Sequence, residues 1–128
     1  MKFLFDSHLL IWAASGSNRM PKHALALLND KNTEIVFSSA SLWEISIKAA
    51  RGSRGFQVDP RLLLRNLLDN DFTELTMTSH HGIAVLGLPG IHKDPFDRLL
   101  IAQAITEGIT LLTSDDTIAK YPGPIRKV

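Results

Sequence analysis

Short apolar runs alternate with longer stretches of helical periodicity along most of this 128-residue chain. The runs lie at residues 2–5, 34–38, 72–77 and 109–114, and residues 125–128 are expected to add an edge strand. Such alternation predicts a parallel sheet covered by helices on both faces, joined by right-handed crossovers. We therefore expect an α/β fold with three α/β/α layers and a mainly parallel central sheet of about four to five strands.

Helices are expected at residues 8–14, 21–28, 40–50, 61–70, 79–88 and 95–107, with a short one at 115–121. The segment 95–107 carries the clearest signals, because Asp94 and Pro95 favour a helix start and Gly108 favours its end. Trp12 and Trp43 lie on apolar helix faces. Core packing is expected for both, with an oligomer interface as the alternative. Gln103 is expected to face a cleft or to hydrogen-bond to backbone.

The composition describes an ordinary globular chain, for which we expect one domain over residues 1–128. The formal net charge of +1 indicates no global attraction to nucleic acid or membrane. The absence of cysteine excludes disulfides and thiolate metal sites. Asp6 interrupts the first apolar run, and no stretch approaches the ~20 apolar residues of a membrane helix. These features predict a cytoplasmic protein without a membrane partner.

Four acidic positions share one kind of place in the expected fold. Asp6 and Asp115 follow strands, while Glu44 and Asp97 lie near the starts of helices. Since the carboxyl ends of parallel strands share one edge of a sheet, the four carboxylates could meet in one cleft. Asp116 is adjacent to Asp115, and the sequence leaves open whether it shares that role.

Helix capping explains each acid when it is taken singly. Asp is a preferred N-cap, and Ser41 and Glu44 have the spacing of a capping box. Asp94 is expected to cap the helix that begins at Pro95, which leaves the Asp97 carboxylate free.

The set as a whole favours a metal site. Clustered carboxylates repel one another, and Mg²⁺ or Mn²⁺ removes that repulsion through the oxygen ligands it prefers. The lack of a His and Cys cluster disfavours zinc. The chemistry that such a site serves best is phosphodiester hydrolysis.

Other polar residues offer weaker candidates. Ser7 and Thr113 could orient a water, although hydroxyls at strand ends usually cap helices. Arg98 could contact a phosphate or form a salt bridge. The histidines show no ligand spacing and receive no role. Scattered candidate phosphate contacts are Lys48, Arg51 and Arg54.

Four blocks of the sequence together resemble the PIN-domain ribonucleases, and among them the VapC-type toxins of bacterial toxin–antitoxin pairs. The blocks are FLFDSHLLIWA, VFSSASLWEISIKAARG, LPGIHKDPFDRLLIAQAITEG and TLLTSDDTIAKY. The resemblance implies that Asp6, Glu44, Asp97 and Asp115 hold one or two Mg²⁺ or Mn²⁺ ions and that a metal-activated water cleaves RNA. It also implies a homodimer, a small VapB-type antitoxin as partner, and an RNA substrate for which transfer RNA is a family-level guess.

Two alternatives remain at this stage. A non-catalytic RNA- or protein-binding module could keep the PIN fold without its activity. A phosphatase of the haloacid-dehalogenase type would also place an Asp after the first strand. It needs a second Asp two positions later, where this chain has His8.

Overall fold

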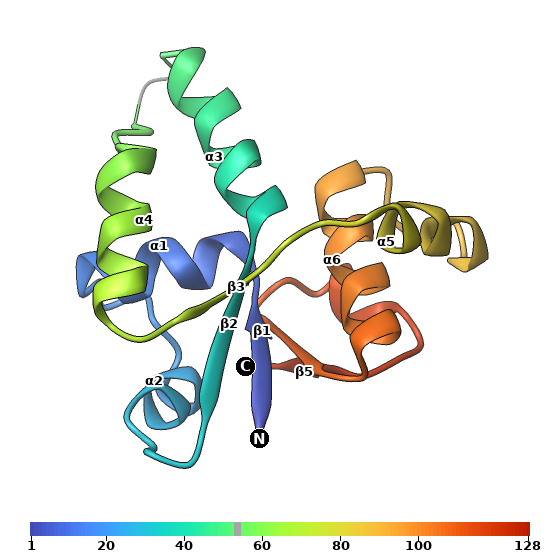
Figure 1. Cartoon of the computed structure of the whole chain (residues 1–128), viewed down its shortest axis with the longest axis horizontal. Coiled ribbons are helices and arrows are strands. Elements are labelled where there is room, and N and C mark those ends of the chain that lie inside the picture. The colour runs from blue at the N-terminus through green and yellow to red at the C-terminus, as the bar shows by residue number, and fades with distance from the viewer. Residues whose placement is uncertain (53–54) are drawn as a thin grey trace.

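A five-stranded parallel sheet forms the centre of the molecule, with helices on both of its faces (Figure 1). The structure is a computed structural model that describes residues 1–52 and 55–128. The elements, in chain order, are β1 Lys2–Phe5, α1 Ser7–Ser15, α2 Lys22–Leu28, β2 Glu34–Ser38, α3 Ser39–Ala50, α4 Pro60–Asp69, β3 Thr73–Leu75, α5 Ser79–Ala84, the 3₁₀ turn η1 Val85–Gly87, α6 Pro95–Glu107, β4 Thr110–Thr113, the 3₁₀ turn η2 Ile118–Lys120 and β5 Ile125–Lys127. The predicted three-layer α/β fold is confirmed.

Successive side chains of each central strand enter two different cores. Phe3 and Phe5 of β1 pack with residues of α1, α2 and α4, whereas Leu4 packs with residues of α6 and η2. In Figure 1 these two groups of helices lie on opposite sides of the sheet. Because side chains of a strand alternate between its faces, a strand buried on both sides is a continuous apolar run. This explains why KFLF and TLLT show no polar alternation.

The strand order creates a crevice beside β1. The sheet runs β3–β2–β1–β4–β5, so the chain first builds outward on one side of β1 and then crosses to the other side. Ligands of open parallel sheets bind where the strand order reverses, at the carboxyl ends of the strands. Phe5 lies opposite Leu112 in the β1–β4 pairing, which places the following residues, Asp6 and Thr113, side by side.

Helix α6 begins and ends as its sequence signals predict. The Asp94 carboxylate accepts hydrogen bonds from the backbone N–H groups of Phe96 and Asp97, at 2.8 and 3.0 Å. Pro95 occupies the first turn, and Gly108 ends the helix with φ 67°. The prediction that Asp94 caps this helix is confirmed, so the Asp97 side chain is not needed as a cap.

Three local predictions are wrong. Helix α3 begins at Ser39 and is capped by Ser38, so Ser41 and Glu44 do not form a capping box. Trp43 is 63% exposed and lies edge-on to Phe96, and is therefore not a core residue. The third concerns residues 79–88, which form the short helix α5 and the turn η1 in place of one helix.

The structure also bears on the expectations for Trp12, Gln103 and a membrane-spanning helix. Trp12 is partly buried and packs against the core cluster beside α1. Gln103 is fully buried, and its amide nitrogen lies 3.4 Å from Nδ1 of His81. It therefore neither faces a cleft nor bonds to backbone through this nitrogen. Arg54 lies outside the described residues. Among residues 1–52 and 55–128, no helix has the length and apolar character needed to cross a bilayer.

Candidate metal and catalytic site

The four acids singled out from the sequence line one pocket of about 220 Å³ at the carboxyl edge of the sheet. Asp6 comes from the end of β1, Glu44 from α3, Asp97 from the first turn of α6 and Asp115 from the loop after β4. The full lining is Asp6, Ser7, His8, Glu44, Lys48, His92, Asp94, Asp97, Asp115 and Ile118. Among the residues that the structure describes, five carboxylates and one lysine line this pocket.

Asp6 is held by two hydrogen bonds at the base of the pocket. Its Oδ1 accepts from the backbone N–H of Leu9 at 2.9 Å, which caps α1, and its Oδ2 accepts from the hydroxyl of Thr113 at 2.6 Å. Burial raises the pKa of Asp6 above its usual value, and the bonds from Thr113 and Leu9 oppose that rise. Asp6 thus combines the capping role with a place in the pocket, and Thr113 serves as its hydrogen-bond donor.

Glu44 lies inside helix α3 and is only 6% exposed. Its Oε1 accepts from the Ser7 hydroxyl at 2.8 Å, and its Oε2 lies 3.1 Å from the ammonium of Lys48, one turn later. Ser7 thus fixes one oxygen of Glu44. Lys48 supplies the positive charge that partly offsets the acids of the pocket.

The environment of Asp97 disfavours its charge. Its pKa rises to about 7, first because of burial and then because the Asp94 and Glu44 carboxylates repel its charge. Oδ2 of Asp97 lies 2.8 Å from Nε2 of His92, an interaction that lowers the pKa in part. A metal-free pocket therefore holds Asp97 at considerable electrostatic cost.

Asp115 is oriented by backbone groups. Its own N–H donates to the Thr113 hydroxyl at 3.0 Å, and its Oδ1 accepts from the N–H groups of Thr117 and Ile118 at 2.7 and 3.1 Å. Asp116 has a different environment. Its side chain is exposed and paired with Lys127, which lowers the pKa of Asp116. The geometry therefore places Asp115 in the pocket and Asp116 outside it.

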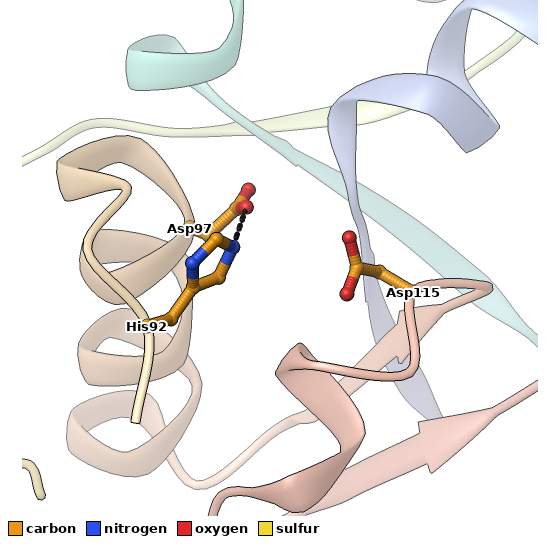
Figure 2. Close-up of side chains that lie close together, drawn as sticks. All are labelled: His92, Asp97 and Asp115. Atoms are coloured by element: carbon orange, nitrogen blue, oxygen red, sulfur yellow. Dashed lines mark hydrogen bonds and ion pairs between the residues drawn. The ribbon is translucent and has the colours of Figure 1, made fainter. Parts of the chain in front are cut away.

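His92 is a pocket residue that the sequence interpretation missed. Figure 2 shows His92, Asp97 and Asp115 turned toward one another, and one donor atom from each lies within 4.8 Å of the others. Its place depends on the tertiary contact with Asp97, and no local sequence signal marks it. For Arg98 the sequence left open a phosphate contact or a salt bridge. Its side chain donates to the backbone carbonyls of Pro89 and Val85 and does not line the pocket.

The donor set fits a hard divalent cation. Carboxylate oxygens dominate it, and Mg²⁺ and Mn²⁺ prefer such ligands. Burial of several like charges in a small pocket is unfavourable unless an opposite charge joins them. Asp6, Glu44, Asp97 and Asp115 all line the pocket, and Asp97 and Asp115 bring donor atoms within 4.8 Å of each other and of His92. The bonds from Ser7 and Thr113 orient Glu44 and Asp6.

Comparisons with known proteins agree with this architecture. The family model described as PIN domain matches residues 3–124. A search of curated proteins finds no significant match.

Among solved structures, the chain is similar to one in VapBC2 from Rickettsia felis bound to a promoter DNA fragment, with TM-score 0.72 and 19% identity over 99% of this chain and 98% of that one. DNA-bound VapBC from Salmonella typhimurium gives 0.67 and 20% over 99% and 98%. A toxin–antitoxin complex from Klebsiella pneumoniae gives 0.65 and 18% over 98% of both chains. At these identities the likeness establishes the fold alone.

Proposed function

The chain belongs to the PIN-domain family, and from this premise we propose that it is a Mg²⁺- or Mn²⁺-dependent endoribonuclease, the toxin of a toxin–antitoxin pair. The observation that carries the proposal is the meeting of Asp6, Glu44, Asp97 and Asp115 in one pocket. These acids come from four separate segments of the chain. Capping accounts for Asp6, and backbone hydrogen bonds in the turn after β4 account for Asp115. Neither accounts for the positions of buried Glu44 and half-buried Asp97.

The geometry of the pocket supports a division of labour among its residues. A divalent cation bound there would neutralise the carboxylates, lower the pKa of a coordinated water and offset charge on phosphoryl oxygens. Asp6, Glu44, Asp97 and Asp115 would hold it. Ser7 and Thr113 keep Glu44 and Asp6 in place through their hydroxyl bonds. Lys48 is 42% exposed beside Glu44, where its ammonium could meet a phosphate of the substrate.

The proposal includes the partners of such a toxin. Several solved structures of the same fold are VapBC or toxin–antitoxin complexes, which supports a VapB-type antitoxin as the partner of this chain. A homodimer is supported by large apolar side chains exposed on α5 and η1, where Ile83 and Leu86 are 63% and 88% exposed. RNA is the proposed substrate, with transfer RNA the first to test, and the cytoplasm is the proposed site of action.

The deciding experiment is RNA cleavage by the purified chain, freed of any antitoxin, with Mg²⁺ or Mn²⁺ and with EDTA. We expect cleavage only with metal. Asp97→Asn should abolish it, while Asp94→Asn should retain most of it because Asn also caps a helix. An intact RNA pool with both metals would contradict the nuclease proposal. RNA binding that Asp6→Ala leaves unchanged, without calorimetric metal binding, would favour the non-catalytic module.

A further inference from the structure

The ring of His92 is oriented from both sides. Its Nδ1 lies 3.4 Å from the backbone nitrogen of Asp94, and its Nε2 lies 2.8 Å from Oδ2 of Asp97 (Figure 2). A backbone N–H can only donate, so Nδ1 acts as the acceptor and the ring proton is on Nε2. In this tautomer Nε2 donates to Asp97. His92 therefore bridges the residue that caps α6 and the acid in its first turn.

The backbone of His92 is fixed as well. Its N–H donates to the hydroxyl of Tyr121 at 2.7 Å, and Tyr121 is only 4% exposed. Arg98 donates to the same hydroxyl at 3.1 Å and to the carbonyl of Pro89 at 2.8 Å. The buried side chain of Tyr121 and the partly buried side chain of Arg98 thus hold the loop that carries His92. A solvated surface histidine needs no such support.

We propose that His92 is a positioning residue for the metal site, whose Nε2–H holds Oδ2 of Asp97 and leaves Oδ1 to face the cation. This inference rests on the proposed function, since it assumes that the pocket binds a divalent ion. Among the described residues, Oδ1 of Asp97 has no hydrogen-bond partner, whereas Oδ2 is engaged by His92. The bond therefore selects which carboxylate oxygen is available.

Direct ligation by His92 is the competing role for the same side chain. A ring nitrogen that carries a proton has no lone pair for a cation, and hard cations such as Mg²⁺ prefer oxygen ligands over imidazole. Mutation of a residue that orients a metal ligand through a hydrogen bond typically lowers metal affinity or activity by about 10–100-fold. Loss of the His92 bond should therefore weaken metal binding without removing a ligand.

Nuclear magnetic resonance of the ring nitrogens separates the two roles. In the metal-free protein we expect the Nε2–H tautomer of His92, and we expect the proton to remain on Nε2 when Mg²⁺ is added. Loss of that proton with Mg²⁺, as direct coordination requires, would overturn the positioning role. So would a metal-free ring protonated on Nδ1 alone.

Calorimetric Mg²⁺ titration of three variants supplies the second test. His92→Ala should weaken binding about tenfold, and His92→Gln should restore most of the loss because its amide can donate from the place of Nε2. His80→Ala, an exposed histidine of α5, is the matched control and should bind as the wild type does. Unfolding in EDTA should show that all three variants are folded.

The outcomes also distinguish this role from the proposed function. If the wild type binds Mg²⁺ and His92→Ala binds it equally well, only the role of His92 is overturned. If the wild type binds neither Mg²⁺ nor Mn²⁺, the proposed function fails and the role of His92 fails with it.

Discussion

Replacing Asp97 by Asn should make the metal-free protein more stable at neutral pH. The half-buried Asp97 carboxylate lies near the charges of Asp94 and Glu44, and its pKa is raised from 3.8 to about 7. A raised pKa means that the native state binds a proton more tightly than the unfolded chain does. Stability therefore falls as the pH rises from about 4 through about 7, since ionisation of Asp97 favours unfolding over that range. Asn is neutral at every pH and can still accept the His92 hydrogen bond.

The size of the effect follows from the pKa. One pKa unit corresponds to about 1.4 kcal/mol, so a rise from 3.8 to about 7 corresponds to roughly 4 kcal/mol. The Asp97 side chain is only 19% exposed, so solvent screens the repulsion incompletely. We expect Asp97→Asn to raise the free energy of unfolding by roughly 2–4 kcal/mol near pH 8 and by clearly less near pH 5.

Urea unfolding in EDTA at both pH values is the assay. Asp116→Asn is the matched control, because the pKa of Asp116 is lowered by Lys127 and its charge is favourable. That variant should not gain stability near pH 8. If Asp97→Asn is no more stable than the wild type near pH 8, or gains equally at both pH values, the electrostatic account of the pocket is wrong.

Three further predictions concern Mg²⁺ binding at the site and the hydrogen bonds that hold its residues. Mg²⁺ at a hundred times its dissociation constant should stabilise the wild type by about 2.7 kcal/mol in thermal unfolding. The Asp97→Asn variant should show little of this stabilisation. Equal stabilisation of both proteins would mean that the ion binds elsewhere. Thr113→Val removes the 2.6 Å bond to buried Asp6 and should cost roughly 1–3 kcal/mol in urea unfolding; an unchanged midpoint would argue against that bond. Tyr121→Phe removes the hydroxyl that holds the His92 backbone and should weaken calorimetric Mg²⁺ binding in the same direction as His92→Ala, by a smaller factor; unchanged affinity would show that the loop needs no such anchor.

Much of the fold could be predicted because its signals are local. A strand buried on both faces is apolar throughout, and KFLF and TLLT show this without knowledge of their neighbours. Asp94, which caps the start of α6, and Gly108, which ends α6 in the left-handed conformation, are likewise signals from residues adjacent in sequence. Where local signals compete, the sequence interpretation failed. Ser38 and Ser41 are both good cap residues, and only the end of β2 decides that Ser38 is used.

The sequence predicts that the acids lie at one edge of the sheet, but it does not predict which residues surround them. Parallel strands bring their carboxyl ends to one edge, so the sequence predicts that Asp6 and Asp115 lie close together. The partners of these acids depend on contacts between residues far apart in the chain, such as Thr113 with Asp6 and Ser7 with Glu44. Those contacts decide the burial of the carboxylates, and burial raises the pKa of Asp6 and of Asp97.

The sequence by itself determined the layers, the strand positions and which acids lie at the carboxyl edge of the sheet, because periodicity and capping are properties of neighbouring residues. Only the tertiary structure decided that Asp116 pairs with Lys127 outside the pocket, that Trp43 is exposed, and that His92 binds Asp97. The physical reason is that hydrogen bonding and desolvation depend on what surrounds a side chain in space. His92 has no spacing typical of a ligand. Its backbone N–H is held by the hydroxyl of Tyr121, which is 29 residues away in the chain.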